Sequence, residues 1–283
     1  MMYPFLTLDD QTEIVHSDMQ PNGTVKVYVE KPDERDGFHS AYCILPGYHW
    51  TDVSGFLVVD PRIVENPRTI HTITYRELRE LSYMGATVLH EDAIFPVSAC
   101  GIPINIRNTN KPEAEGTMIV ASVEGESRDG IVTGIAGKRN FSVITLEKDM
   151  MNVERGFGRR VLSVLEEEGI SFEHLPTGID TMSIVVADKE LDGKLEHVLE
   201  GIRSQAHPDS IDVQRDMALI AVVGRSMVRS FGTAGRVFGA LGRAKVNVRM
   251  IDQGSSELNI IVGVANDCFH TAIRAIYDEF FAN

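Results

Sequence analysis

Apolar residues in the second half of the chain follow a pattern that occurs twice. The stretch Met151–Val186 aligns with Met227–Val262 without a gap, at a constant offset of 76 residues (227 − 151 = 76). Self-similarity at a fixed spacing indicates a duplicated supersecondary unit, and two copies favour a paired domain over a solenoid. The identical pairs are Met151, Gly156, Arg160, Val161, Leu165, Gly178, Ile184 and Val186 with Met227, Gly232, Arg236, Val237, Leu241, Gly254, Ile260 and Val262.

Each copy reads as strand, helix, strand, strand, helix. Alternating and β-branched residues predict the strands, and apolar residues three and four apart predict the helices. A further strand is needed to complete a split β-α-β sheet, with the helices on one face. The first copy is predicted to hold strands at Ser142–Leu146, Ile170–Leu175 and Met182–Ala187, a turn at Thr177-Gly178, a helix through Val161 and Leu165 ending at Gly169, and a helix through Leu195 and Ile202. The second is predicted to hold strands at Ala218–Val223, Val246–Ile251 and Leu258–Val264, a helix around Val237–Leu241, and a helix from Phe269 to Phe280.

The first 120 residues read as a series of shorter elements. Thr74 and Glu77 have the spacing of a capping box, which predicts a helix running towards Gly85. Pro61 disfavours helix at Asp60, so the D-P-R sequence predicts a bend. The other predicted elements are strands at Thr24–Glu30, Phe56–Val59, Ile102–Ile106 and Thr117–Ser122, and a helix at Glu91–Ala99.

Composition narrows the class of protein. The net charge of −14 argues against nucleic acid or an anionic membrane as a partner. No apolar run reaches the length of a membrane span, and the first ten residues lack the basic start of a signal peptide. Cys43, Cys100 and Cys268 are far apart and read as reduced thiols of a cytoplasmic protein. No spacing typical of a metal site is present, so no metal ligand is predicted.

The repeated unit resembles the ACT domain, a small-molecule-sensing module that usually works in pairs. The resemblance implies an amino acid bound where the first strand turns into the first helix, where free N–H groups favour a carboxylate. Glycines at Gly156 and Gly232 would allow close approach, although a purely structural turn also favours glycine. We expect the first copy to bind the effector, with Glu173 facing an ammonium group; the alternative is an exposed strand carboxylate. The expected contacts are Met151, Gly156, Phe157, Glu173, Thr177 and Asp180.

Residues 51–120 resemble the closing part of the aspartokinase catalytic domain, which has an amino-acid-kinase fold. The resemblance is carried by TDVSGFLVVDPRIV, ITYRELRELSYMGATVLHEDAI and GIPINIRNTNKPEAEGTMIV. It implies a partial α/β kinase domain at 1–116 and α+β, ferredoxin-like ACT domains at 117–213 and 214–283, with strands exchanged between the two. It also implies ATP contacts at Thr51, Asp52, Leu57, Arg62, Thr87 and Val88, although Thr87 stands where the family usually has lysine and Arg62 could instead pair with Glu65.

The phosphate-binding loops of aspartokinases are not found in the sequence. Neither their opening lysine with its glycine-rich loop nor their S-R-G-G-S-D loop is present, so no catalytic residue is identified. The first hypothesis is an aspartokinase that phosphorylates L-aspartate with ATP and Mg²⁺, is inhibited by lysine or threonine, and dimerises through its ACT domains. The second is a non-catalytic, amino-acid-binding regulatory protein that keeps a kinase remnant. The missing loops favour the second hypothesis, and the run from Thr51 favours the first.

Overall fold

The structure is a computed structural model that describes residues 55–86, 98, 101–108, 111, 113–123 and 130–282, and the backbone of residues 13–19 and 25–30. The two backbone stretches are strands β1 (Glu13–Met19) and β2 (Val25–Glu30), which pair antiparallel. Strand β2 confirms the strand predicted at Thr24–Glu30.

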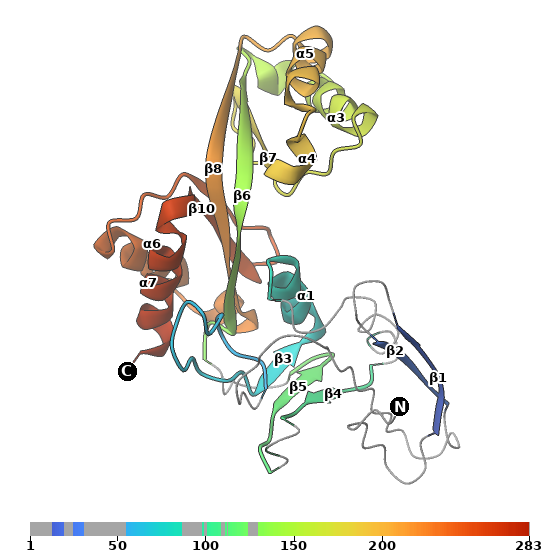
Figure 1. The fold of residues 1–283 in the computed structure, drawn as a ribbon. Coiled ribbons are helices and arrows are strands. Elements are labelled where there is room, and N and C mark those ends of the chain that lie inside the picture. Colours follow the sequence, from blue (N-terminus) through green and yellow to red (C-terminus); the bar gives the residue numbers. More distant parts are fainter. Residues whose placement is uncertain are drawn as a thin grey trace.

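Two long strands run through both repeat units. Strand β6 (Gly134–Glu147) and strand β8 (Ser210–Val223) lie at the centre of a five-stranded sheet with the order β7-β6-β8-β10-β9 (Figure 1). Their register shifts around Phe141, and the adjacent residues Asn140 and Asp216 have positive φ angles of 68° and 59°. Each long strand therefore serves one repeat unit with one end and the other unit with the other end.

The first unit spans residues 141–214. Helices α3 (Phe157–Glu167) and α5 (Leu195–Ala206) pack side by side over β7 (Thr181–Ala187) and the upper parts of β6 and β8 (Figure 1). The short helix α4 (Asp188–Leu191) follows β7, and Gly169 ends the turn after α3 with a φ of 63°. Its buried core includes Ile144, Leu146, Val161, Ile184 and Ile202.

The second unit spans residues 217–281 and borrows a strand. Residues 134–139 of β6 pair with residues 218–223 of β8, so the strand needed to complete this unit precedes the first unit in the chain. Its other elements are η2 (Arg225–Arg229), α6 (Thr233–Arg243), β9 (Met250–Asp252), β10 (Asn259–Ala265), η3 (Asn266–Cys268) and α7 (Phe269–Phe281).

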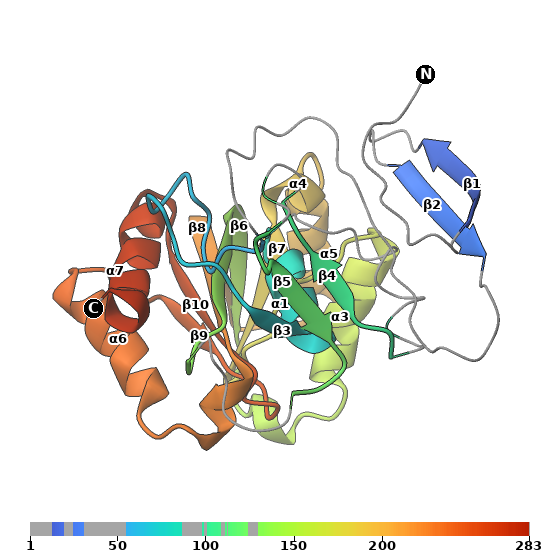
Figure 2. The ribbon, with the colours of Figure 1, turned by 90° about the horizontal axis from the view of Figure 1, so that it is seen from below.

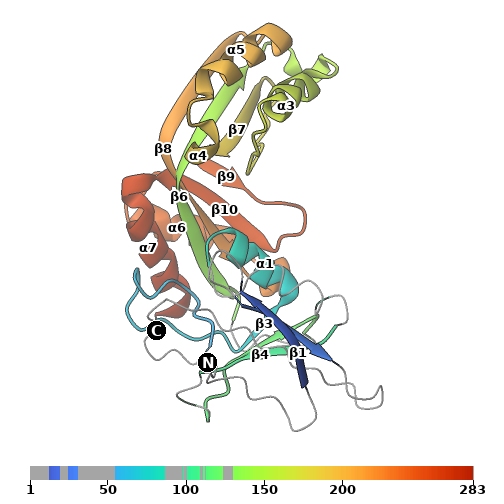
Figure 3. The same ribbon diagram turned by 45° about the vertical axis from the view of Figure 1, so that its right-hand side comes forward.

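The described residues between 55 and 120, here called the first segment, dock against the second unit. The segment holds β3 (Thr72–Thr74), α1 (Tyr75–Tyr83), β4 (Ile104–Ile106) and β5 (Thr117–Val120), with the sheet order β3-β5-β4. The capping box of Thr74 and Glu77 at the start of α1 is confirmed. Helix α1 lies on one side of the second unit's sheet, and α6 and α7 lie on the other (Figures 2 and 3).

The first segment and the second unit share one hydrophobic core. Buried Leu78 and Ile119 of the segment belong to the same cluster as Leu219 and Ile260 of the second unit. The helices of the first unit have a separate core, although Val143 and Val185, in the sheet of the first unit, join the larger cluster. In the part of the chain that the structure describes, no helix has the length and apolar character needed to cross a membrane.

Two predicted strands are wrong. Phe56–Val59 is buried but forms only an isolated bridge between Leu57 and Thr69, because its backbone groups bond to scattered partners such as the Thr117 hydroxyl. Ile170–Leu175 forms a single bridge at His174, and the following Pro176 has no N–H to extend a ladder. Strand β9 is also shorter than predicted, and the helix predicted at Glu91–Ala99 lies outside the described residues apart from Ser98.

Candidate functional site

The connection from β6 to α3 forms one side of the predicted effector site. After β6 the chain makes the 3₁₀ turn η1 (Met151–Val153), in which Met151 is buried. Gly156, with a φ of 80°, begins α3, and no side chain caps the first turn of that helix. Phe157 is buried in the first unit's core. The turn therefore has the uncapped N–H groups and the small residue that the sequence predicts for binding a carboxylate.

The hairpin before β7 forms the opposite side. The backbone N–H of Lys148 donates to the Asp180 carbonyl at 2.9 Å, and the Lys148 carbonyl accepts from the Met151 N–H at 3.1 Å. Lys148 thus brings the hairpin turn against the β6–α3 connection. Thr177 bonds within its own hairpin, its hydroxyl donating to the Leu175 carbonyl at 3.1 Å.

Glu173 has a carboxylate oxygen with no bonding partner. Its backbone N–H donates to the Val185 carbonyl at 2.8 Å, which ties this residue to β7. Its Oε2 atom is buried and accepts no hydrogen bond from any residue that the structure describes. A buried carboxylate oxygen without a donor is energetically costly, so this position favours a ligand that supplies N–H groups.

Apolar side chains are exposed around this site. Met150, Val153, Phe172 and Ile179 have exposed fractions of 66%, 61%, 42% and 70%. Met150 and Val153 belong to the β6–α3 connection, and Phe172 and Ile179 belong to the segment that carries Glu173 and Asp180. Large apolar residues that are exposed on the segments of a predicted site are typical of an interaction surface.

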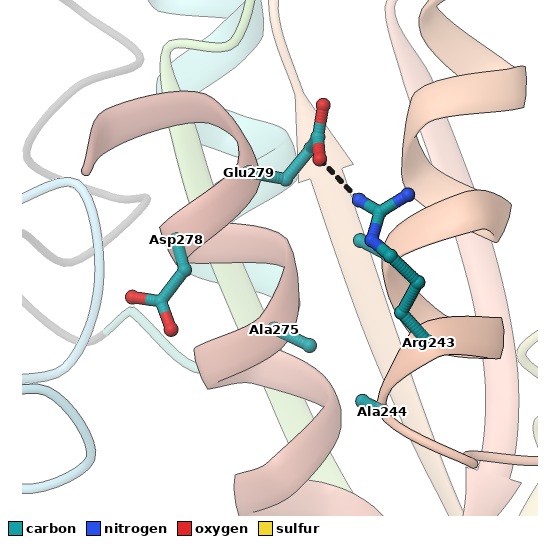
Figure 4. A pocket seen from close by; sticks show the side chains of 6 residues that line it. Arg243, Ala244, Ala275, Asp278 and Glu279 are labelled. Carbon is teal, nitrogen blue, oxygen red and sulfur yellow. Dashed lines mark hydrogen bonds and ion pairs between the residues drawn. The ribbon is translucent and has the colours of Figure 1, made fainter. Parts of the chain in front are cut away.

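Two pockets among the described residues lie outside this site, one next to it and the other in the second unit. One, of about 370 Å³, is lined by Leu162, Leu165, Glu166, Ile170, Ser171 and Phe172, next to the position of Glu173. Another, of about 380 Å³, lies between α6 and α7 and is lined by Ala240, Arg243, Ala244, Ala275, Asp278 and Glu279 (Figure 4). In Figure 4, Arg243 reaches across to Glu279, whereas Asp278 points away from α6. Hydrogen bonds from Arg236 and Arg243 hold the pKa of Glu279 below its usual value. Neither pocket contains a predicted effector residue.

A polar contact joins the two repeat units close to the site. Nδ1 of His174 lies 2.7 Å from Oδ2 of Asp252, which ends β9 in the second unit. Nε2 of His174 is buried and has no hydrogen-bond partner among the described residues. His174 follows Glu173 directly, so the predicted ligand contact and the contact between units lie on consecutive residues.

Two of the predicted ATP-side residues are described. Leu57 bridges to Thr69, and Arg62 lies in the turn after Asp60 with 81% of its side chain exposed. The guanidinium of Arg62 pairs with Asp60 and not with Glu65, its Nε lying 3.0 Å from each carboxylate oxygen. Partial burial raises the pKa of Asp60, but the hydrogen bonds and charge of Arg62 outweigh it and leave that pKa lowered. The predicted contacts Thr51, Asp52, Thr87 and Val88 lie outside the described residues.

Glu77 has a second role that the sequence does not indicate. Its side chain is fully buried, and besides capping α1 it binds two residues of the ACT-like region. Oε1 accepts from the Thr133 hydroxyl at 2.6 Å and from the Arg225 N–H at 2.9 Å, and Oε2 accepts from Arg225 Nη1 at 2.9 Å. Burial raises the pKa of Glu77, but these bonds outweigh it, so its pKa is lowered. Thr133 and Arg225 are separated from Glu77 by 56 and 148 residues in the sequence. A capping-box pattern spans four residues and cannot predict such distant partners.

The described residues hold no cluster of three or more histidine, cysteine, aspartate or glutamate side chains that could bind a metal ion. A Mg²⁺ ion at the nucleotide side is therefore not assigned to any protein ligand in this part of the chain.

Comparison with known proteins matches two family models. Residues 48–108 match the amino acid kinase family, and residues 220–280 match the ACT domain. Aspartokinase 3 of Bacillus subtilis is 44% identical over 235 residues, which cover 83% of this chain and 51% of that protein. A bifunctional aspartokinase/homoserine dehydrogenase of Haemophilus influenzae is 34% identical over 239 residues, covering 83% of this chain and 29% of that protein. The chain therefore spans about half or less of the length of these relatives.

Solved structures give the same match. The aspartate kinase of Clostridium acetobutylicum is 57% identical with a TM-score of 0.77, covering 81% of this chain and 53% of that one. Aspartokinase III of E. coli, in complex with aspartate and ADP in its R-state, is 26% identical with a TM-score of 0.69, covering 82% and 51%. The same enzyme in complex with lysine and aspartate, in its T-state, has a TM-score of 0.65.

Proposed function

We propose that this chain, which belongs to the aspartokinase family, forms the effector-sensing part and the ATP-side edge of an aspartokinase. The reaction would transfer the γ-phosphoryl group of ATP to the side-chain carboxylate of L-aspartate, giving 4-phospho-L-aspartate. The observation that carries the proposal is the order of the parts: an amino-acid-kinase match at 48–108, then a duplicated ACT-like unit docked onto it. By resemblance to the family, this reaction would start the biosynthesis of lysine, threonine and methionine, and the enzyme would be cytoplasmic.

The ATP side would be formed by the turn that follows Leu57 together with the residues predicted at positions 51, 52, 87 and 88. Arg62 would contribute a planar fork of N–H donors, which suits phosphate oxygens. It would first have to leave Asp60, and exposed ion pairs are weak enough to exchange partners. Mg²⁺ would neutralise the phosphate charge while bound mainly by the nucleotide, as is common for this ion.

The effector site would be the first unit's turn, with L-lysine as the ligand. Its carboxylate would bind the uncapped N–H groups at Gly156 and Phe157, and an ammonium group would bind the unpartnered oxygen of Glu173. Met151, Thr177 and Asp180 would close the site from both sides. Lysine is bound in the related E. coli enzyme in its T-state, which supports lysine over threonine.

A homodimer through the first unit is part of the same proposal. The exposed Met150, Val153, Phe172 and Ile179 would be covered by the same surface of a second copy. Light scattering of the purified chain should give twice the monomer mass, and Ile179→Asp should shift it towards the monomer. A monomeric wild-type chain at working concentration would contradict the dimer.

The effector site is tested by calorimetry with L-lysine and L-threonine. Glu173→Ala should weaken lysine binding at least roughly tenfold, as expected for loss of one charged contact. Glu200→Ala, which removes an exposed carboxylate from α5 in the same unit, is the matched control and should bind as the wild type does. Equal affinities of the Glu173 and Glu200 variants would remove Glu173 from the site.

The catalytic part of the proposal is tested by aspartate-dependent ADP release, with and without lysine. Turnover that lysine suppresses would establish a feedback-regulated aspartokinase. Lysine binding without turnover would leave an amino-acid-binding regulatory protein, the second hypothesis from the sequence.

A further inference from the structure

The buried carboxylate of Glu77 is bonded from three separate parts of the chain. Thr74, at the start of α1, donates to Oε2 through its N–H at 2.9 Å and its hydroxyl at 2.7 Å. Thr133 donates from the residue before β6, and Arg225 donates with its N–H and its guanidinium from the residue that begins η2. The side chain of Arg225 is itself largely buried, with 16% exposed. Loss of the carboxylate would remove the acceptor of the Thr133 hydroxyl and of the Arg225 backbone N–H, which is costly, whereas Arg225 Nη1 would still donate to the Thr72 carbonyl at 3.2 Å.

The repeat shows what this carboxylate does for the second unit. The offset of 76 residues maps Arg225 onto Asp149 (225 − 76 = 149), the residue at the same exit from the central strand in the first unit. The backbone N–H of Asp149 donates to the Asp209 carboxylate at 2.6 Å. Both units therefore end this strand with an N–H group bonded to a carboxylate. The first unit takes the carboxylate from its own residues, whereas the second takes it from the first segment.

We propose that the strand exit of the second unit is a carboxylate-binding site, and that Glu77 is its built-in ligand. Glu77 would then be a positioning residue that fixes α1 on the second unit. Helix α1 ends at Tyr83, and Ala86 precedes the predicted nucleotide contacts Thr87 and Val88. The site would thereby set where the ATP-side residues lie relative to the sensor. Only this last step depends on the proposed function; the site itself does not.

Charge complementarity separates this site from ordinary packing. Helix α1 also packs through Leu78 and Leu81, which would hold it in place without any carboxylate. A packing role predicts that Glu77 can be replaced only by another side chain attached to the helix. A carboxylate site predicts that a small free carboxylate can replace it, because the donors of Thr133 and Arg225 stay in place.

The test is chemical rescue of Glu77→Ala by formate, followed by hydrogen–deuterium exchange and thermal unfolding of the full chain. We expect exchange in residues 75–86 to rise at least roughly tenfold in Glu77→Ala, as for removal of one partner of a buried pair. Formate should reverse much of that rise and raise the Tm of this variant, whereas sodium chloride at the same ionic strength should not. Wild-type protein should respond equally to both salts.

Asp209→Ala is the matched control, because it removes the carboxylate that binds the Asp149 N–H at the equivalent position of the first unit. It should raise exchange around residues 148–153 and leave residues 75–86 as they are in the wild type. If Glu77→Ala does not fold, Glu77→Gln is measured instead. Glutamine has the shape of glutamate and fills the same space, but it has no carboxylate. Hydrogen–deuterium exchange in residues 75–86 should therefore rise in Glu77→Gln and should not respond to formate.

Formate acting no better than chloride on Glu77→Ala, or unchanged exchange in residues 75–86 of Glu77→Gln, would overturn the proposal. No measurement in this test uses ATP, aspartate or lysine. A chain without kinase activity would therefore contradict only the catalytic part of the proposed function and leave this result standing. Failure of the formate rescue would contradict the carboxylate site and leave the proposed function standing.

Discussion

The separate cores of the two repeat units predict that the first unit opens without the second. Ile184 is fully buried in the core of the first unit, and its counterpart in the repeat, Ile260 (184 + 76 = 260), is 1% exposed in the shared core of the second unit and the first segment. The two isoleucines occupy equivalent positions in β7 and β10. The same substitution can therefore be made in each core with its counterpart as the control.

Ile184→Ala and Ile260→Ala should each cost about 2–5 kcal/mol, the usual loss when buried atoms are removed and a cavity remains. Since about 1.4 kcal/mol is a tenfold change in an equilibrium constant, amide exchange in the affected region should accelerate by about 30-fold to about 4,000-fold. Ile184→Ala should act on α3, α5 and β7. Ile260→Ala should act on α6, α7 and also α1, because the first segment shares its core.

Hydrogen–deuterium exchange followed by mass spectrometry of short peptides measures these effects, under conditions where exchange reports the opening equilibrium. The long strands β6 and β8 belong to both units and are left out of the comparison. Equal acceleration of α6 and α7 in both variants would show that the two units open together. If Ile260→Ala accelerated amide exchange in α6 and α7 but not in α1, the first segment would not open together with the second unit.

Two other predictions concern backbone strain and acid stability. Gly116→Ala should destabilise the chain far more than Gly101→Ala, as measured by thermal unfolding. Both glycines have positive φ angles, which cost alanine about 1–2 kcal/mol. Only at Gly116 would the new Cβ also clash, because it would lie 2.1 Å from the carbonyl oxygen of Ile106. The pKa of Glu77 is lowered in the folded chain, so its stabilising contribution is complete above the unfolded value of about 4.3 and is lost as the pH falls through the folded pKa. Between these values the stability of Glu77→Gln should fall less steeply with decreasing pH than that of the wild type; parallel curves would contradict the lowered pKa.

Much of the fold could be predicted from the sequence where short-range patterns decide it. The capping box at Thr74 correctly predicts the start of α1, and Gly169 correctly predicts the end of α3. Both signals depend on residues within one helical turn. The repeat predicted two similar units and a strand missing from each. Which segment supplies that strand to the second unit depends on the pairing of residues 134–139 with 218–223, and no local pattern encodes that pairing.

The errors and omissions have the same physical origin. Phe56–Val59 has the composition of a buried strand, but its apolar side chains are buried in the core shared with the second unit without a ladder of hydrogen bonds. Glu77 reads as a surface capping residue until Thr133 and Arg225 are brought to it from other parts of the chain. The predicted effector residues remain predictions, as do Leu57 and Arg62 at the ATP side. The structure places Asp180 against the β6–α3 connection, and Glu173 is distinguished by its unpartnered oxygen.

The two copies of the repeat have diverged in charge at matching positions, which fits the different roles proposed for them. Glu173 of the first unit corresponds to Arg249 of the second (173 + 76 = 249), and Asp149 corresponds to Arg225. The acidic copy carries a buried carboxylate oxygen with no partner among the described residues, which suits an ammonium ligand, and exposed apolar residues, which suit contact with a second chain. The basic copy binds an acidic side chain of the first segment, because Arg225 donates hydrogen bonds to Glu77. The first segment shares its core with the second unit, and β6, β8 and the His174–Asp252 contact connect the second unit to the first. Any effect of a ligand in the first unit on the ATP-side residues would therefore pass through the second unit.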